Sequence, residues 1–199
     1  VGIHPHDAIR WAECAPKFQS FVEHSPIRQK CVAVGEIGLD FYYNYSPKEI
    51  QFDVFESQVA LAKTLELPIV VHCRDAFDDL YGLLDKIGMP PRGGVMHCFT
   101  GDKAQAKRAI DLGFWISFSG IVTFKKATTL QEAAKMIPAD RVLFETDCPY
   151  LAPEPFRGKP NEPALVKHTA EFLAKLRGVS FEKLVEQTTE NVSAAFAIF

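Results

Sequence analysis

The 199-residue sequence predicts an α/β fold, a parallel (β/α) barrel of the TIM type, and three observations support this prediction. Short apolar runs alternate with amphipathic stretches, as expected for parallel strands joined by right-handed helical crossovers. The ends of the apolar runs recur roughly every 28 residues, about the unit length of a (β/α)8 barrel. Side chains that bind metals stand at four of these ends. We expect one domain over residues 1–199, with about six of the eight βα units.

Five runs rich in Val, Ile and Phe are the predicted strands. Most are apolar almost throughout, as strands buried on both faces must be. Residues Val1–Ile3 resemble the end of a further strand. The five runs are Val32–Leu39, Pro68–His72, Gly94–Cys98, Phe114–Phe118 and Arg141–Glu145.

The helix after the first of these strands has a clear start signal. Ser46 is followed by Pro47 and by Glu49, which predicts a capping box with Ser46 as the N-cap residue. The Pro- and Gly-rich stretch Pro149–Pro163 predicts a long loop.

Composition limits the class of protein. The formal net charge of -3 argues against a general nucleic-acid coat protein, so DNA binding requires a local patch and metal ions. No apolar run approaches the ~18 residues of a membrane span, and no signal peptide pattern is visible. The five cysteines form no CxxC pair, which favours a reduced, cytoplasmic protein. We expect no membrane association and no obligate protein partner.

Four predicted strands end in residues that bind metals or transfer protons. These residues are Glu36, His72, His97 and Asp147. The carboxyl ends of barrel strands share one rim, where active sites lie, so we expect the four side chains to converge there. A lone buried His or Asp is often structural, but four at strand ends are a less common coincidence. Two imidazoles and two carboxylates suit Zn, Mn or Mg.

The neighbours of these four residues agree with this orientation. Cys73, Cys98 and Cys148 each follow a candidate ligand by one residue, so alternation along a strand predicts that they pack into the helix layer. Glu145 shares a face with Asp147 and is a candidate second carboxylate supporting the ligands.

Several distinctive segments occur along the chain. They are GEIGLD at Gly35–Asp40, VVHCRDA at Val70–Ala76, GVMHCFTG at Gly94–Gly101, ISFSGIVTF at Ile116–Phe124, ETDCPYLAP at Glu145–Pro153, RGKPNEPA at Arg157–Ala164 and TTENV at Thr188–Val192. Together they resemble the TatD family of metal-dependent deoxyribonucleases, and the resemblance extends over nearly the whole chain.

The resemblance implies a TIM barrel related to amidohydrolases and a DNase activity, often that of a 3′-exonuclease. It implies two divalent metal ions (Mg, Mn or Zn), with Glu36 bridging them and His72 and His97 as ligands of one. It further implies that Asp147 binds metal and manages the proton of the attacking water, so the expected catalytic residues are Asp147 and Glu36.

The sequence departs from the family pattern at one point. The family begins with a strand ending in His-x-His, and this sequence lacks that strand. His4 and His6 are an alternative source of ligands, since they share a face if the segment is a strand. However, GIHPHDA resembles the third-strand segment of the family. We therefore expect two units, about 60 residues, to be missing from a full barrel.

Three residues are candidate substrate contacts. Arg74 follows His72 by two positions and suits a phosphate, with a local salt bridge as the alternative. Arg157 lies in the long loop and either meets substrate or is simply solvated. His4 is expected to line the site. Aromatic side chains after the GEIGLD segment either stack on nucleobases or pack on a helix; they are Phe41, Tyr42, Tyr43 and Tyr45.

These observations predict a hydrolase that cleaves DNA phosphodiesters from an end with a metal-activated water. One alternative is a related hydrolase that acts on a small phosphoester, lactone or amide. Another is an inactive, truncated chain. A flavin or NAD enzyme has little support, because no GxGxxG follows any predicted strand.

Overall fold

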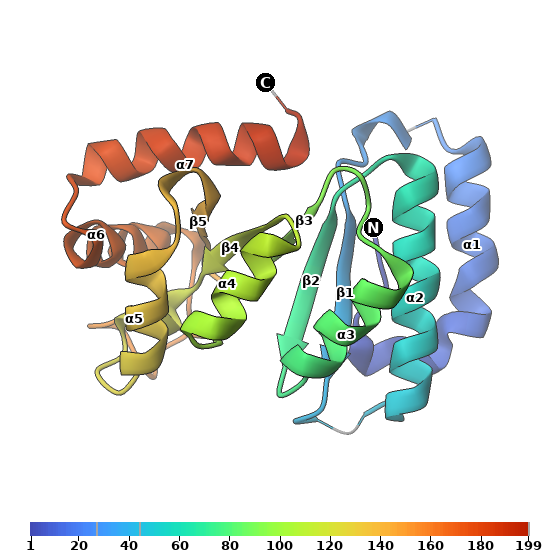
Figure 1. Ribbon diagram of the computed structural model, residues 1–199, viewed down its shortest axis with the longest axis horizontal. Helices are drawn as coiled ribbons and strands as arrows, with labels where there is room; N and C mark the ends of the chain where they lie inside the picture. Colours follow the sequence, from blue (N-terminus) through green and yellow to red (C-terminus); the bar gives the residue numbers. More distant parts are fainter. Residues whose placement is uncertain (27, 44, 199) are drawn as a thin grey trace. The chain divides into compact units, whose positions relative to one another are not determined.

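The computed structural model describes residues 1–26, 28–43 and 45–198. It contains two compact units, Val1–Gly94 with Phe196–Ile198, and Val95–Ala195. Each unit combines helices with a pair of parallel strands (Figure 1). The single domain expected from the sequence stays a prediction.

The first unit contains the strands β1 (Val34–Asp40) and β2 (Ile69–Arg74). They pair in parallel, with Gly38 opposite His72 and Asp40 opposite Arg74. The helix α2 lies against β1 (Figure 1) and contributes the buried side chains Phe55 and Val59. The other elements are η1 (Pro5–Arg10), α1 (Trp11–His24), η2 (Arg28–Lys30), α2 (Lys48–Leu65) and α3 (Phe77–Ile87).

The second unit contains β4 (Phe114–Phe118) and β5 (Val142–Phe144), which are also parallel, with Ile116 opposite Val142. Asn191, buried in the TTENV segment, donates two hydrogen bonds of 2.8 Å, one to the carbonyl of Ala139 just before β5 and one to the carbonyl of Val142, the first residue of β5. The helices are α4 (Lys103–Asp111), η3 (Gly120–Thr123), α5 (Thr128–Met136), η4 (Ala139–Arg141), η5 (Pro163–Leu165), α6 (Val166–Arg177) and α7 (Phe181–Phe196).

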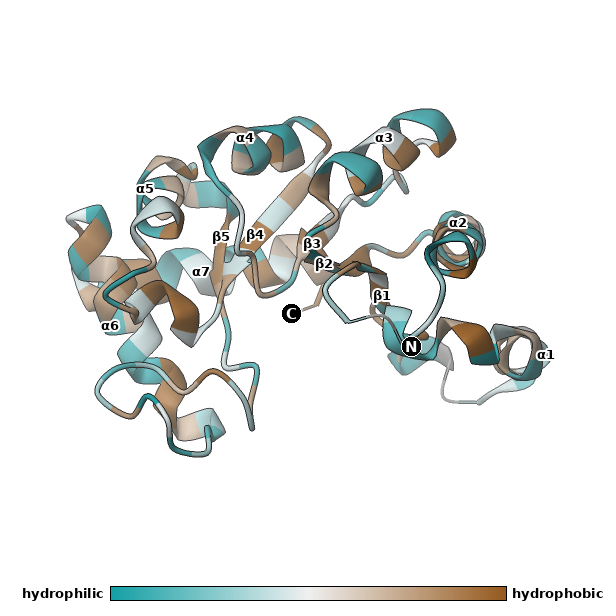
Figure 2. Ribbon diagram, turned by 90° about the horizontal axis from the view of Figure 1, so that it is seen from below, coloured by the Kyte–Doolittle hydropathy of each residue, from teal (hydrophilic) through white to brown (hydrophobic). Residues whose placement is uncertain are grey.

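Within each unit, hydrophobic residues of the helices and strands occupy buried positions. Along α3, hydrophobic residues recur between hydrophilic ones (Figure 2), and Leu80 and Leu84 are buried. Strand β4 is fully buried at Phe114, Ile116 and Phe118. Each unit thus has the pattern expected where amphipathic helices cover buried strands of the same unit.

All five predicted strands are present among the described residues. Phe114–Phe118 has its predicted ends, and the ends of the other four are shifted. Strand β3 (Gly94–Met96) ends before His97, because Cys98 takes a left-handed conformation with φ 43°. Strand β5 ends at Phe144, three residues before Asp147. The candidate ligands His97 and Asp147 therefore lie in the loops that follow their strands.

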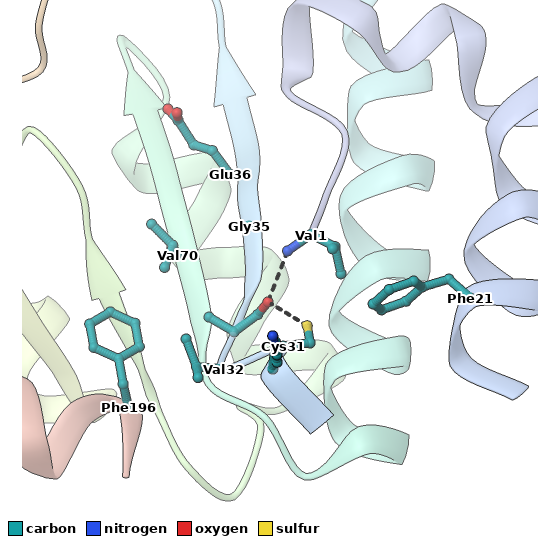
Figure 3. A pocket seen from close by; sticks show the side chains of 10 residues that line it. Val1, Phe21, Cys31, Val32, Gly35, Glu36, Val70 and Phe196 are labelled. Carbon is teal, nitrogen blue, oxygen red and sulfur yellow. Dashed lines mark hydrogen bonds between the residues drawn. The ribbon is translucent and has the colours of Figure 1, made fainter. Parts of the chain in front are cut away.

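Val1 lies beside β1 in the extended arrangement expected for Val1–Ile3. The amino group of Val1 donates to Ala33 O (3.1 Å), and Gly35 N–H donates to Val1 O (2.8 Å), which is the bonding pattern of a parallel pair. A largely apolar pocket of about 450 Å³ adjoins this pairing, and Phe21, Val32 and Val70 are among its lining residues (Figure 3).

The predicted capping box at Ser46 is wrong. Helix α2 begins at Lys48, with Pro47 at its N-cap. Ser46 is buried, and its hydroxyl donates to His6 O (2.9 Å) and accepts from Ile9 N–H (3.1 Å). The hydroxyl thus satisfies the backbone of η1 instead of α2. A capping box does occur at α4, between Asp102 and Gln105.

In the part of the chain that the structure describes, no helix is both long and apolar enough to cross a membrane.

Replacing Gly38 by Ala should lower the free energy of unfolding by about 1–3 kcal/mol, the usual cost of overpacking. Gly38 has φ +143°, and a Cβ there would lie 1.9 Å from the carbonyl oxygen of His72. Gly82 in α3 is a matched control, since its Cβ would meet nothing within 4 Å. Urea denaturation should show Gly82→Ala to be neutral or stabilising; equal stability of both variants would contradict the close approach of β1 and β2.

Candidate active site

Three histidines gather in the first unit. The backbone N–H of His6 donates to Nδ1 of His4 (3.2 Å), which fixes the ring of His4 at the start of η1. The ring centre of His4 lies 4.3 Å from that of His6 and 4.6 Å from that of His72. One ring nitrogen from each histidine lies within 4.8 Å of the others, a spacing compatible with a shared metal ion.

Glu36 adds a carboxylate to this cluster. Its Oε1 lies 3.1 Å from Nδ1 of His72 and 3.5 Å from Nε2 of His4. The side chain is one-third exposed and points toward the carboxyl ends of β1 and β2 (Figure 3). The structure therefore brings together His4, Glu36 and His72, three of the predicted site residues.

The residue that organises the cluster is Asp40, which sequence reasoning missed. Its side chain is fully buried, and its Oδ2 lies 2.9 Å from Nε2 of both His6 and His72. Its Oδ1 accepts hydrogen bonds from the backbone N–H groups of Tyr42 (3.0 Å) and Tyr43 (2.8 Å). In metal sites, a histidine ligand is commonly oriented by a carboxylate that is hydrogen-bonded to the ring nitrogen that does not bind the metal.

Asp40 remains ionised despite its burial. Burial alone raises the pKa of a carboxyl group, but the N–H of Tyr43 and the imidazoles of His6 and His72 outweigh it, and the net pKa is lowered. The buried carboxylate is therefore available as an acceptor for both imidazoles.

Two buried glutamines of α2 hold the backbone around the cluster. Gln51 accepts from Asp40 N–H (2.8 Å) and donates to Asp40 O (3.0 Å). Gln58 accepts from Ile3 N–H (2.7 Å) and donates to Ile3 O (3.1 Å). Each amide thus pairs with both backbone groups of one residue, and together they fix the positions of Asp40 and of the segment before His4.

The second unit contains the other two predicted ligands, His97 and Asp147. Nδ1 of His97 lies 2.8 Å from Oε1 of Glu145, and Nε2 lies 3.6 Å from Oδ1 of Asp147. Glu145 also accepts from Cys98 N–H (2.8 Å) and from the hydroxyl of Ser117 (2.5 Å). The carboxylate expected to support the site therefore orients His97 directly.

The loop that bears Asp147 is fixed by its own hydrogen bonds. Asp147 has φ 57°, a left-handed conformation that Asp tolerates better than most residues. Asn161, buried in the RGKPNEPA segment, donates to Thr146 O (2.7 Å) and Tyr150 O (2.6 Å) on either side. These two hydrogen bonds hold the backbone on both sides of Asp147 and so position its carboxylate.

Glu36 and His72 belong to one unit, and His97 and Asp147 belong to the other. The convergence of all four around bound ions stays a prediction. Both histidines nevertheless share one feature. Each has a carboxylate beside both of its ring nitrogens.

The predicted substrate contacts make aromatic contacts in the structure. The guanidinium of Arg74 lies 3.7 Å from the ring centre of Tyr42 and 4.8 Å from that of Tyr43. Within the described residues no carboxylate forms an ion pair with Arg74, so the local salt bridge is not formed. Arg157 lies 4.2 Å from the ring centre of Phe124 in the second unit.

The cysteines behave as expected in part. Cys73 is buried, and Sγ of Cys98 lies 3.1 Å from the hydroxyl of Ser119. Cys148 is exposed, so its predicted packing role is wrong. It follows β5 in a turn, where the alternation of strand faces does not apply.

The sequence does contain signals that could have identified Asp40 and His6 as site residues. Asp40 has the same parity as Glu36 along β1, so both belong to one strand face, and it is the last residue of that strand. His6 is two residues after His4, but Pro5 starts a 3-10 helix there. The two rings therefore meet through a turn and not through a shared strand face.

A family model described as TatD related DNase matches residues 1–197. The chain belongs to the TatD family of metal-dependent hydrolases. The metal-dependent hydrolase YabD of Bacillus subtilis, named as uncharacterized, is 46% identical over 100% of this chain and 76% of that protein. The 3'-5' ssDNA/RNA exonuclease TatD of Klebsiella pneumoniae is 37% identical over the same shares, 100% and 76%.

The TatD assignment agrees with a solved structure. The crystal structure of YJJV, a TatD homologue from Escherichia coli K12, matches with a TM-score of 0.91 and 29% identity. The match covers 100% of this chain and 76% of that chain. The predicted fold class, a parallel α/β barrel of the TIM type, is thereby confirmed.

Replacing Asp40 by Ala should lower the free energy of unfolding by about 3–5 kcal/mol, because the buried partners of a charged group lose their acceptor. Asp7→Ala is the control, since Asp7 is 58% exposed and its 3.8 Å contact with Arg10 lies at the surface. Chemical denaturation followed by circular dichroism measures both. A loss below 1 kcal/mol for Asp40→Ala would show that Asp40 does not organise the cluster.

Cysteine reactivity should separate the buried thiol from the exposed one. Burial raises the pKa of Cys73 far above its usual range, so little thiolate forms near pH 8. Mass spectrometry after iodoacetamide treatment should find Cys148 alkylated and Cys73 unmodified in the folded protein. Unfolding in urea should expose both, and rapid labelling of Cys73 in the native state would contradict its burial.

Proposed function

We propose that this TatD-family chain is a nuclease that hydrolyses phosphodiester bonds at the ends of DNA strands. The observation that carries the proposal is the cluster of His4, His6 and His72, in which Glu36 lies beside His4 and His72 and the buried Asp40 pairs with His6 and His72. The activity in the name of the Klebsiella relative, 3'-5' ssDNA/RNA exonuclease, supports the choice of substrate.

The donor set fits divalent cations such as Mg, Mn or Zn, because it offers imidazole nitrogens and carboxylate oxygens and no thiolate. Glu36 and His72 would hold an ion in the first unit, and His97 and Asp147 would hold one in the second. A bound divalent ion would lower the pKa of its bound water toward ~7 and would stabilise charge on phosphoryl oxygens.

The protein's own residues orient the ligands and move the proton. Asp40 holds Nε2 of His72, so Nδ1 faces Glu36. Glu145 holds Nδ1 of His97, so Nε2 faces Asp147. Asp147 is partly exposed and accepts the proton of the attacking water. Arg74 and Arg157 supply positive charge for the phosphates of the substrate.

Replacing Asp147 by Asn should reduce kcat on single-stranded DNA by about 10²–10⁴-fold, the usual contribution of a general base. The assay uses a labelled oligonucleotide with Mg or Mn, and Asp140→Asn, at an exposed position in η4, is the matched control. Circular dichroism verifies the fold of both variants.

Two outcomes would contradict the proposal. Equal activity of Asp147→Asn and the unchanged chain would remove Asp147 from the mechanism. Hydrolysis of a small carboxylic ester or amide, with none of DNA or RNA, would assign the site to another substrate class.

A further inference from the structure

The loop after β1 divides its aromatic side chains between two environments. Phe41 packs against α2, with its ring centre 5.9 Å from that of Phe52 and 3.9 Å from Nζ of Lys48. In contrast, Tyr42, Tyr43 and Tyr45 are 57%, 38% and 64% exposed. Of the two roles expected for these aromatic side chains, packing on a helix therefore applies to Phe41. The three tyrosines remain at the surface.

These three tyrosines form an ordered group, which we call the tyrosine shelf. The rings of Tyr43 and Tyr45 are stacked, with centres 5.4 Å apart and an interplanar angle of 8°. Tyr42 meets Tyr43 edge to face, with centres 4.8 Å apart. Because these rings already hold one another, a flat ligand meets a surface that requires little further ordering.

The shelf adjoins the candidate metal ligands within the same unit. The ring of His6 lies 5.3 Å from that of Tyr43 and 4.9 Å from that of Tyr45, centre to centre. His6 in turn shares the Oδ2 oxygen of Asp40 with His72. A group stacked on the shelf would therefore lie beside the residues that would hold the reacting phosphate.

Positive charge accompanies the shelf. Arg74 stacks on Tyr42, and no carboxylate within the described ranges forms an ion pair with it. Its guanidinium can therefore neutralise a phosphate while remaining on the ring. Aromatic faces next to a free cation are the features that recognise single-stranded nucleic acid.

We propose that the tyrosine shelf is a stacking subsite for an unpaired nucleobase, and that Arg74 contacts an adjoining phosphate. The inference rests on the proposed function, and it specifies a substrate with an unpaired end. A base within a duplex is already stacked on its neighbours, so the shelf selects single strands or frayed ends over duplex. Stacking on a ring face is tolerant of sequence, so we expect no strong base preference.

Binding without hydrolysis tests the subsite directly. Fluorescence anisotropy in EDTA compares a labelled oligothymidylate with an abasic oligomer that has the same number of phosphates. The unchanged chain should bind the base-containing strand at least 5-fold more tightly. Tyr45→Ala should raise its Kd by about 5-fold to 150-fold, the range for the loss of one stacked base, and Tyr45→Phe should retain affinity.

Met136→Ala, which removes an exposed apolar side chain in the second unit, is the control and should bind normally. Equal affinity for the two oligomers, or an unchanged Kd in Tyr45→Ala, would overturn the subsite. Such a result would also leave a protein or another apolar partner as the occupant of the shelf.

The same variants separate the subsite from the proposed function. With metal present, Tyr45→Ala should raise KM for single-stranded DNA with little change in kcat, and should leave kcat/KM on the abasic strand unchanged. Base-dependent binding without any hydrolysis would refute the nuclease activity and retain the subsite. Hydrolysis without base-dependent binding would refute the subsite alone.

Discussion

One buried carboxylate, that of Asp40, determines the geometry of the first unit's site. A single oxygen of Asp40 pairs with Nε2 of both His6 and His72. The other oxygen is bonded to the two N–H groups that begin the tyrosine loop. A buried charge without partners is energetically unfavourable, so the buried carboxylate of Asp40 and the groups that pair with it depend on one another. The candidate metal ligand His72, the tyrosine shelf and the end of β1 are therefore ordered together.

In the second unit, a different carboxylate orients a histidine in the same way. Glu145 pairs with Nδ1 of His97 and is itself held by Ser117 and by a backbone N–H. The two histidines thus present different nitrogens, Nδ1 of His72 and Nε2 of His97, toward Glu36 and Asp147. In both units the carboxylate that orients the histidine follows or ends a strand, which is where barrel enzymes place their chemistry.

Much of this arrangement could be predicted from the sequence, because strand-end positions follow from apolar runs. The strands were located to within a few residues. His97 and Asp147 lie just beyond strand ends and His72 lies near the end of β2, whereas Glu36 lies inside β1. Asp40 was missed because a buried acid at a strand end resembles a helix cap or a loop residue until its partners are known. Those partners, His6 and Gln51, come from segments whose meeting depends on packing and not on any local pattern. The capping box at Ser46 failed for the same reason, since a contact with η1 outweighed a local preference.

We infer that Asp40 holds Nε2 of His72 and leaves Nδ1 for a metal ion beside Glu36. Anomalous diffraction from crystals of the Mn- or Zn-loaded protein tests it most directly. We expect an ion about 2.0–2.3 Å from Nδ1 of His72 and from a Glu36 oxygen, with the hydrogen bond from His72 to Asp40 kept. An ion bound to Nε2 of His72, with Asp40 displaced or itself a ligand, would contradict it.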